Sequence, residues 1–203
     1  MVNRGDRLGW LRDWALGRKN SPDGGGSHEA SVKDRFAACL PIILHHEGGW
    51  ADHPKDPGGS TMKGITLATY SKYLGRPASK DELRNISDAD LQQIYHSLYW
   101  GRASCDRLPV GVDLCVFDMA VNAGVGRAIK LLQEVVGSTP DGAVGPETLA
   151  AVAKQDTLHL IRQYSEARRA FYQSLGAYVT FGRGWLRRTD EVEAEAIKQG
   201  SGK

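Results

Sequence analysis

The chain has 203 residues, 41% of them hydrophobic and 25% charged, which is typical of a globular protein with its own core. Its 26 basic residues against 24 acidic residues leave a net charge of only +2, so we expect no nucleic acid as the partner. No stretch reaches the roughly 18 apolar residues of a membrane span, which argues against stable membrane insertion. The three cysteines have no regular spacing and predict buried thiols rather than a disulfide framework.

The first 20 residues mix basic side chains with leucines and two tryptophans, Trp10 and Trp14, but contain no continuous apolar run. We therefore expect no ordinary signal peptide. Two interpretations stay open: a short amphipathic helix with affinity for a membrane or a partner, or an appended segment that packs its tryptophans on its own protein. The glycine-rich stretch Ser21–Ser27 predicts a linker, so we assign residues 1–30 to an N-terminal extension.

The first helix of the main body is expected to begin near Ser31, because Ser31 and Asp34 have the spacing of a capping box. Apolar residues three and four positions apart give this helix one buried face. It should end at Glu47, where two glycines follow. A negative charge is unfavourable at a helix C-terminus, so Glu47 either joins a structural cap or salt bridge or has a function.

Residues 50–65 are rich in glycine and proline and predict an irregular segment with room for a short β-hairpin. The rest of the chain predicts helices and no long β pattern, so the expected fold class is mainly α. Capping boxes at Ser79 and Ser87 mark two helix starts, and Pro146 fits the first position of another helix. The expected helices lie at about 66–74, after 79, 87–99, 110–122, 129–136, from 146, at 157–175 and at 184–199.

Carboxyl groups around the irregular segment permit glycosidase chemistry. Cleavage of a glycosidic bond needs an acid for the leaving oxygen and a carboxylate or an activated water at the sugar. Glu47 is expected at a helix end, and Asp56 follows nine positions later on a glycine-rich loop that could fold back over it. Asp52 is a rival for the second position, and Asp56 has an alternative interpretation as a turn residue before Pro57.

The same region contains histidines that invite a metal interpretation, at positions 45, 46 and 53. Their spacing matches no zinc motif, and the turn at 141–145 lacks the alternating acidic ligands of a calcium loop. The glycine-rich loop also lacks the Gly-Lys-Ser/Thr of a phosphate-binding loop. We therefore expect no metal and no cofactor.

Several side chains are candidates for sugar contacts. Aromatic residues stack on sugar rings, but aromatics at helical spacing are more often core residues, so we expect one or two of them in the cleft. Asn122 either bonds an N-acetyl group or caps a helix end. The aromatic candidates are Trp50, Tyr70, Tyr95, Tyr99 and Trp100.

Three stretches together resemble the signature of glycoside hydrolase family 108, which comprises phage-type and secreted N-acetylmuramidases. They are Leu44–Trp50 (LHHEGGW), Asp56–Thr61 (DPGGST) and Gly64–Thr66 (GIT). The helix Phe117–Gly124 also resembles that family, and Asp141–Leu149 is similar to the start of its C-terminal peptidoglycan-binding region. The resemblance covers about residues 34–198. It implies a muramidase domain at 31–125 and a helical, peptidoglycan-binding-like region at 126–203 packed on it.

The resemblance further implies a lysozyme-like fold and hydrolysis of the β-1,4 bond between N-acetylmuramic acid and N-acetylglucosamine in peptidoglycan strands. The catalytic glutamate of the family falls on Glu47. The order of residues is also similar to that of the phage lysozymes, in which an Asp and a Thr position the attacking water. By that similarity Asp56 is the second carboxylate, and Thr66 rather than Thr61 is the preferred hydroxyl. Asp52, Thr61, Trp50, Tyr70 and Asn122 remain candidate substrate contacts.

Two alternatives to a hydrolytic muramidase stay open. A lytic transglycosylase shares the fold and the glutamate but needs no second carboxylate, and a wall-binding protein would use neither. We expect a monomer that is made in the bacterial cytoplasm without an ordinary signal peptide. It would reach the wall in the periplasm through a holin or a dedicated secretion system, as an endolysin or as a wall-remodelling enzyme linked to secretion.

Overall fold

The computed structural model describes residues 26–52 and 59–202. The chain divides into two compact units, residues 1–31 and residues 32–203. Of the first unit only the beginning of one helix is described, so the N-terminal extension predicted over residues 1–30 lies almost entirely outside the described residues. The predicted boundary between residues 125 and 126 stays a prediction.

The described part is mainly helical, as the sequence predicted. A π-helical turn and a short 3-10 helix separate the first helices from the later ones. The helices are α2 (Gly26–His46), α3 (Leu67–Leu74), α4 (Lys80–Arg84), α5 (Asp88–Tyr95), the π-helical turn η1 (His96–Trp100), the 3-10 helix η2 (Cys105–Arg107), α6 (Val112–Ala123), α7 (Val125–Val136), α8 (Pro146–Val152), α9 (Thr157–Gln173) and α10 (Tyr178–Gly200).

Three of the predicted helix starts after residue 65 coincide with a local cap or a proline. Ser79 and Glu82 form a complete capping box at α4, and the Ser87 side chain accepts a hydrogen bond from the Asp90 backbone at α5. Pro146 occupies the first turn of α8. These elements begin where the sequence predicted them because the cap groups lie within a few residues of the helix that they stabilise.

Two helices begin earlier than predicted. α2 begins at Gly26 and not near Ser31, because residues 27–30 contain neither proline nor glycine to stop the helix. α10 begins at Tyr178 and not near Gly184. Gly182 lies inside α10 and packs against the Tyr178 ring. A side chain would not fit there, because an added Cβ would lie 2.5 Å from a ring carbon.

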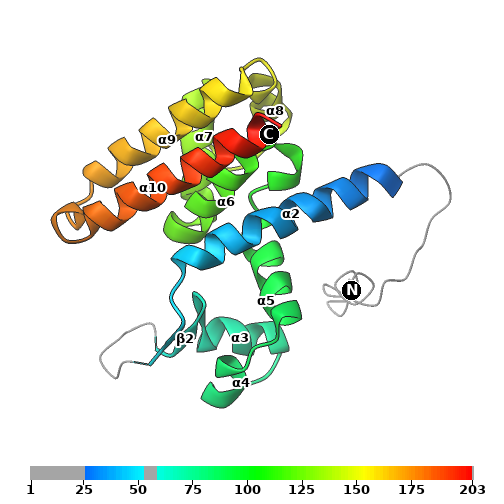
Figure 1. Cartoon of the computed structure of the whole chain (residues 1–203), viewed down its shortest axis with the longest axis vertical. Coiled ribbons are helices and arrows are strands. Elements are labelled where there is room, and N and C mark those ends of the chain that lie inside the picture. The colour runs from blue at the N-terminus through cyan, green and yellow to red at the C-terminus, as the bar shows by residue number, and fades with distance from the viewer. Residues whose placement is uncertain (1–25, 53–58, 203) are drawn as a thin grey trace, which may run out of the picture. The chain divides into compact units, whose positions relative to one another are not determined.

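The predicted β-hairpin region is a small antiparallel sheet in the order β1 (Trp50–Ala51), β2 (Thr61–Met62) and β3 (Ile65–Thr66). Helix α3 packs against β3 and α4 packs against β2 (Figure 1). The turn between β2 and β3 contains Lys63 and Gly64, which both have a positive φ. This turn lies close to the end of α2, as described below.

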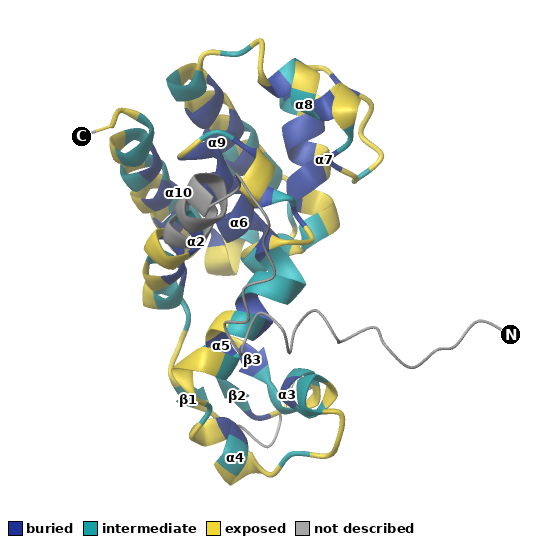
Figure 2. Ribbon diagram, turned by 90° about the vertical axis from the view of Figure 1, so that its right-hand side faces the viewer, coloured by how far each residue is buried: buried dark blue, intermediate teal, exposed yellow. Residues whose placement is uncertain are grey.

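The core of the helical part is built around α6, which packs against α7, α9, α10 and η1. Most residues of α6 are buried (Figure 2). Helices α9 and α10 run side by side over this core (Figure 1). All three cysteines are buried and free. No helix in the described ranges is long and apolar enough to span a membrane.

A partly buried ion pair holds α2 on this core. The Arg35 Nε donates to Asp113 Oδ2 over 2.9 Å, and the Arg35 Nη2 donates to the Leu108 carbonyl over 2.6 Å. Phe36, on the next position of α2, meets the rings of Trp100 and Phe117 edge-on or tilted. These contacts set the direction of α2 and therefore the place at which its C-terminal end arrives.

Candidate active site

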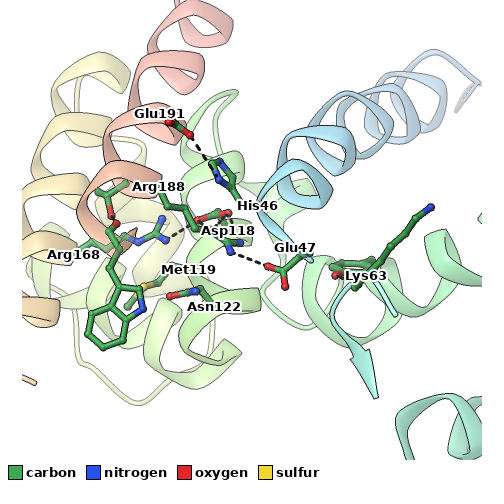
Figure 3. Close-up of polar contacts among 12 residues, drawn as sticks. His46, Glu47, Lys63, Asp118, Met119, Asn122, Arg168, Arg188 and Glu191 are labelled. Carbon is green, nitrogen blue, oxygen red and sulfur yellow. Dashed lines mark hydrogen bonds and ion pairs between the residues drawn. The ribbon is translucent and has the colours of Figure 1, made fainter. Parts of the chain in front are cut away.

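Glu47 follows the last residue of α2, and its backbone N–H still bonds to the Leu44 carbonyl over 3.3 Å. The carboxylate Oε1 accepts a hydrogen bond of 2.8 Å from Arg188 Nη1 of α10, as Figure 3 shows. The Glu47 side chain keeps 18% exposure. The negative charge that is unfavourable at a helix C-terminus is thus balanced by a cation from a distant part of the chain.

Arg188 is itself held by a buried carboxylate. Its Nε and Nη2 both donate to Asp118 of α6, over 3.0 and 2.8 Å to Oδ1. Asp118 also accepts from Arg168 Nη2 of α9 over 2.6 Å (Figure 3). A planar guanidinium that is bonded on two edges cannot turn, so Arg188 presents Nη1 to Glu47 in one orientation.

Charge balance explains why these ions are tolerated in the core. The side chain of Asp118 is fully buried and that of Arg168 is 2% exposed. Burial would raise the pKa of Asp118, but the charges and hydrogen bonds of Arg168 and Arg188 outweigh it and hold that pKa below its ordinary value. Two arginines and the carboxylates of Asp118 and Glu47 make the cluster neutral overall. Below, "the ion network" means Glu47, Arg188, Asp118 and Arg168.

Asn122 is connected to the ion network through Tyr172. Arg168 Nε donates to the Tyr172 hydroxyl over 3.1 Å, and this hydroxyl donates to Asn122 Oδ1. Asn122 lies in the last turn of α6 and is exposed. Its side-chain oxygen is therefore occupied within the protein, whereas both interpretations of Asn122, an N-acetyl contact or a helix cap, require its amide nitrogen and stay predictions.

On its other side Glu47 lies against the β2–β3 turn. A Cβ added to Gly64 would lie 2.8 Å from Glu47 Oε2 and 2.8 Å from Tyr95 Oη. Tyr95 Oη donates to the Lys63 carbonyl over 2.8 Å and so holds this turn. Gly64 also has a φ of +74°, which favours glycine. The glycine of the Gly-Ile-Thr motif thus allows the backbone to pass beside the carboxylate.

Two tyrosines face Glu47 from the α5–η1 segment. Burial, and next the negative charge of Glu47, raise the pKa of Tyr95 and of Tyr99. Both side chains therefore stay neutral phenols. Tyr95 and Trp100 are 1% and 0% exposed, which favours a core role for these two aromatic candidates over stacking on a sugar.

The two candidate threonines face each other across the small sheet. Thr61 of β2 pairs with Thr66 of β3, and both are partly buried. The Thr66 hydroxyl caps α3, since it accepts from the Thr69 backbone over 3.1 Å and bonds the Thr69 hydroxyl over 2.9 Å. The cap expected for Thr66 is therefore present. Its role in positioning a water molecule stays a prediction.

Of the two candidate second carboxylates, only Asp52 lies in the described residues. It accepts hydrogen bonds from Ser60 Oγ over 2.8 Å and from Lys80 Nζ over 3.0 Å. The hydrogen bonds from Ser60 and then from Lys80 lower its pKa. Asp52 therefore ties the strand end to α4. Asp56 belongs to residues 53–58, which lie outside the described part, so its role as the second carboxylate stays a prediction.

The remaining sugar-contact candidates differ in exposure. Trp50 is partly buried in β1, and the guanidinium of Arg84 lies 5.7 Å from its ring centre. Tyr70 is buried in the core and stacks on Tyr73, with ring centres 6.2 Å apart. The position of Tyr70 favours packing over the predicted sugar contact, whereas Trp50 remains accessible.

The histidines before Glu47 do not assemble a metal centre with other described residues. His46 Nδ1 lies 3.7 Å from Glu191 Oε2 (Figure 3). Burial, and next the charge of Arg188, lower the pKa of His46. A neutral His46 adds no second positive charge beside Glu47, so Arg188 is the cation that the carboxylate meets.

Four of the residues around Glu47 were not predicted as site residues, namely Arg188, Asp118, Arg168 and Tyr172. Tyr95 was a candidate only for a sugar contact. One sequence signal pointed to a partner, because Asp118 is an acidic residue in an otherwise nearly apolar helix, and a buried carboxylate requires a cation. Nothing local indicates which arginine supplies it.

Two family descriptions match this chain. Glycosyl hydrolase 108 matches residues 40–124, and Predicted Peptidoglycan domain matches residues 127–190. Glu47 and Asp118 lie in the first matched segment, and Arg168 and Arg188 lie in the second. The ion network therefore joins the two segments at the candidate site.

Among solved structures, the chain is similar to SagA of Brucella abortus. The two share 43% sequence identity with a TM-score of 0.74, and the match covers 83% of this chain and 97% of that chain. A comparison with curated proteins found no match.

Proposed function

The chain belongs to the Glycosyl hydrolase 108 family, and we propose that it is a lysozyme that cleaves the β-1,4 bond between N-acetylmuramic acid and N-acetylglucosamine. The family and the peptidoglycan domain make the chain a glycosidase that acts on peptidoglycan. The prediction of a mainly α, lysozyme-like fold is likewise confirmed. The bond, the catalytic residues and the biological role form the proposal.

The observation that carries the proposal is the environment of the Glu47 carboxyl group. Its Oε1 accepts from Arg188, whereas Oε2 lies beside the Gly64 backbone. When the group is protonated, the proton belongs on Oε2, because Oε1 is already an acceptor. Oε2 is then the atom that donates a proton to the leaving oxygen of the glycosidic bond.

Arg188 adds orientation to this chemistry. A general acid must be held within hydrogen-bond reach of the oxygen that it protonates, and a carboxyl group free to rotate spends little time there. The ion network fixes Glu47 Oε1, so the proton that Glu47 donates to the substrate is carried by Oε2. After transfer, the carboxylate charge is stabilised by the Arg188 guanidinium that already faces it.

Asp56 is our proposed second carboxylate, with Thr66 helping to position the water. Two facts support Asp56 over Asp52: the motif order, and the bonds of Asp52 to Ser60 and Lys80, which commit its oxygens elsewhere. We therefore expect Asp56→Ala to lower turnover more than Asp52→Ala does. Initial rates of sugar release from purified peptidoglycan measure both, and the reverse order would move the second role to Asp52.

We also propose a setting for this activity. A monomer that is made in the bacterial cytoplasm reaches the periplasm through a holin or a dedicated secretion system, and there degrades the wall during host lysis or wall remodelling. The net charge of +2 is compatible with a wall polymer as the substrate and is too small to indicate a nucleic-acid partner.

The direct test of the proposed acid is Glu47→Gln. The amide keeps the shape and can still accept from Arg188, but it has no proton to give, so we expect activity to fall by about 10²-fold or more. New reducing ends from purified peptidoglycan measure the rate, and circular dichroism checks the fold. Glu191→Gln, on α10 next to His46, is the matched control and should keep its activity. A Glu47→Gln protein with near-normal rates would overturn the assignment.

A further inference from the structure

An aromatic column reaches the surface on the first half of α10. Trp185 stacks on Tyr172 with ring centres 5.1 Å apart and planes 26° apart, and Phe181 lies 5.8 Å from Trp185. Tyr172 is buried, Trp185 is partly buried and Phe181 is 56% exposed. We call Tyr172, Trp185 and Phe181 the aromatic column. The Phe181 ring leaves its outer face open to solvent, where the apolar face of a ligand can pack on it.

Asn122 offers a polar group next to the same column. Tyr172 has a single hydroxyl hydrogen, and its oxygen already accepts from Arg168 Nε. The hydrogen therefore goes to Asn122 Oδ1, which is a better acceptor than the sulfur of Met119 at 3.5 Å. This chain of donors fixes the orientation of the Asn122 amide. Its Nδ2 must face away from Tyr172, as a donor on an exposed residue.

Two members of the column share a helix with Arg188, the residue that binds the proposed acid. Trp185 precedes Arg188 by three residues and Phe181 precedes it by seven, so all three share one face of α10. With a rise of 1.5 Å per residue they lie about 4.5 Å and about 10 Å from Arg188 along the helix axis. Because Arg188 bonds Glu47, a polymer that passes Glu47 and continues along α10 meets the column first at Trp185.

We propose that the aromatic column and the Asn122 amide form a subsite for an N-acetylated sugar of the glycan strand, outside the bond that is cleaved. The apolar C–H face of a pyranose ring packs on the exposed ring of Phe181 and on the outer part of the partly buried Trp185. The Asn122 Nδ2 donates to the carbonyl oxygen of the N-acetyl group. The choice of ligand rests on the proposed function.

Charge around the column agrees with this ligand. The first half of α10, residues 178–189, contains three arginines and no acidic residue. Of these, Arg188 is buried in the ion network and Arg187 lies 3.9 Å from Glu191. Arg183 is exposed and has no ion-pair partner among the described residues, so it is the free positive charge of this segment. An anionic polymer such as the bacterial wall is attracted to such a surface.

The size of the apolar surface favours a sugar over a protein partner. Large exposed hydrophobic side chains in the described part are confined to Val110, Val179 and Phe181. Of these, Phe181 belongs to the column, and Val179, two positions before it on α10, faces another side of the helix. One exposed ring matches a ring-sized ligand, whereas a stable interface with a second copy needs on the order of 1,000 Å² of buried surface.

The test measures binding without turnover, in the Glu47→Gln protein. The probes are purified peptidoglycan sacculi, by co-sedimentation, and the β-1,4-linked tetramer of N-acetylglucosamine, by calorimetric titration. Phe181→Ala removes an exposed ring, and Asn122→Asp keeps the oxygen that Tyr172 needs but replaces the outward donor by an acceptor. Phe181→Tyr keeps the ring. Val110→Ala removes an exposed apolar side chain elsewhere and is the matched control.

We expect Phe181→Ala and Asn122→Asp each to weaken binding of the tetramer by about threefold to tenfold. Phe181→Tyr and Val110→Ala should bind as the parent does, and all four should have the parent's melting temperature. Parent-like affinity of Phe181→Ala and Asn122→Asp overturns the inference, as does a parent that binds neither probe. A change in self-association with no change in sugar affinity would assign the surface to a second copy instead.

The binding test of the subsite can fail or succeed independently of the cleavage test of the proposed function. A wild-type chain that cleaves no glycan yet loses tetramer affinity on Phe181→Ala contradicts the proposed reaction and leaves the subsite standing. If the wild type cleaves the glycan and the Phe181→Ala and Asn122→Asp proteins bind the tetramer normally, the subsite is contradicted and the proposed reaction stands.

Discussion

At the scale of single residues, the proposed role of Glu47 as the acid depends on the difference between its two carboxyl oxygens. Glu47 Oε1 is bound to Arg188, and Glu47 Oε2 has the backbone of Gly64 as its neighbour. A carboxyl group in open solvent would have equivalent oxygens and no fixed direction for its proton. The difference between the two oxygens is imposed by α10 on one side and by the β2–β3 turn on the other.

Gly64→Ala tests this close approach. The new Cβ would lie 2.8 Å from Glu47 Oε2, so either the turn or the carboxylate must move, and we expect activity to fall by about tenfold or more. Rates on purified peptidoglycan and thermal unfolding measure the two effects.

Gly75→Ala is the control for backbone strain. Gly75 has a φ of +70°, close to the +74° of Gly64, but an added Cβ there meets no atom within 4 Å. Both variants should lose about 1–2 kcal/mol from an alanine in the left-handed region, and Gly64→Ala should lose more because of its clash with Glu47 and Tyr95. Equal activities of the two would show that the contact with Glu47 does not matter.

At the scale of elements, three helices meet at the ion network. α6 supplies Asp118, α9 supplies Arg168 and α10 supplies Arg188 (Figure 3). Each helix is amphipathic or buried for ordinary packing reasons, but their relative rotation is fixed by charges that would be costly to bury singly. The network therefore couples the packing of α10 to the orientation of the Glu47 carboxyl group.

Asp118→Asn should destabilise the protein by about 3–5 kcal/mol at pH 7, because it leaves two arginines without their buried counter-charge. Urea unfolding measures this loss. Asp88→Asn, which removes an exposed carboxylate 3.6 Å from Lys63, should change stability by no more than about 0.5 kcal/mol. A small effect at Asp118 would mean that the network contributes little to the fold.

The same carboxylate gives a pH dependence. Since the pKa of Asp118 is lower in the folded protein than its ordinary value, its contribution to stability is complete above that ordinary value, about 4. It is lost as the pH falls through the folded pKa. Unfolding of the wild type at a series of pH values should therefore show a decline below about pH 4, and Asp118→Asn should show a smaller one.

At the scale of the whole molecule, the sequence predicted what depends on neighbours in the chain. The caps of α4 and α5, the turn at Gly64 and the position of Glu47 after α2 all follow from a few adjacent residues. The start of α10 was predicted too late, because the packing of Gly182 against Tyr178 is not visible as a helix signal.

The partners of Glu47 could not be predicted in the same way. Arg188 lies 141 positions from Glu47, and Arg168 lies 50 positions from Asp118. Many arginines on amphipathic helices face solvent, and only the packing of α6, α9 and α10 selects these two. The resemblance to the family indicated the acid itself, and the folded chain adds the groups that hold it.

The most direct test of the central claim is mass spectrometry of the soluble products from purified peptidoglycan, with wild type and Glu47→Gln compared. We predict fragments with reducing N-acetylmuramic acid ends from the wild type and almost none from the variant. Anhydro-muramic ends would contradict hydrolysis and make the chain a lytic transglycosylase with no role for Asp56. The same reducing fragments from both proteins would contradict the assignment of Glu47 as the acid.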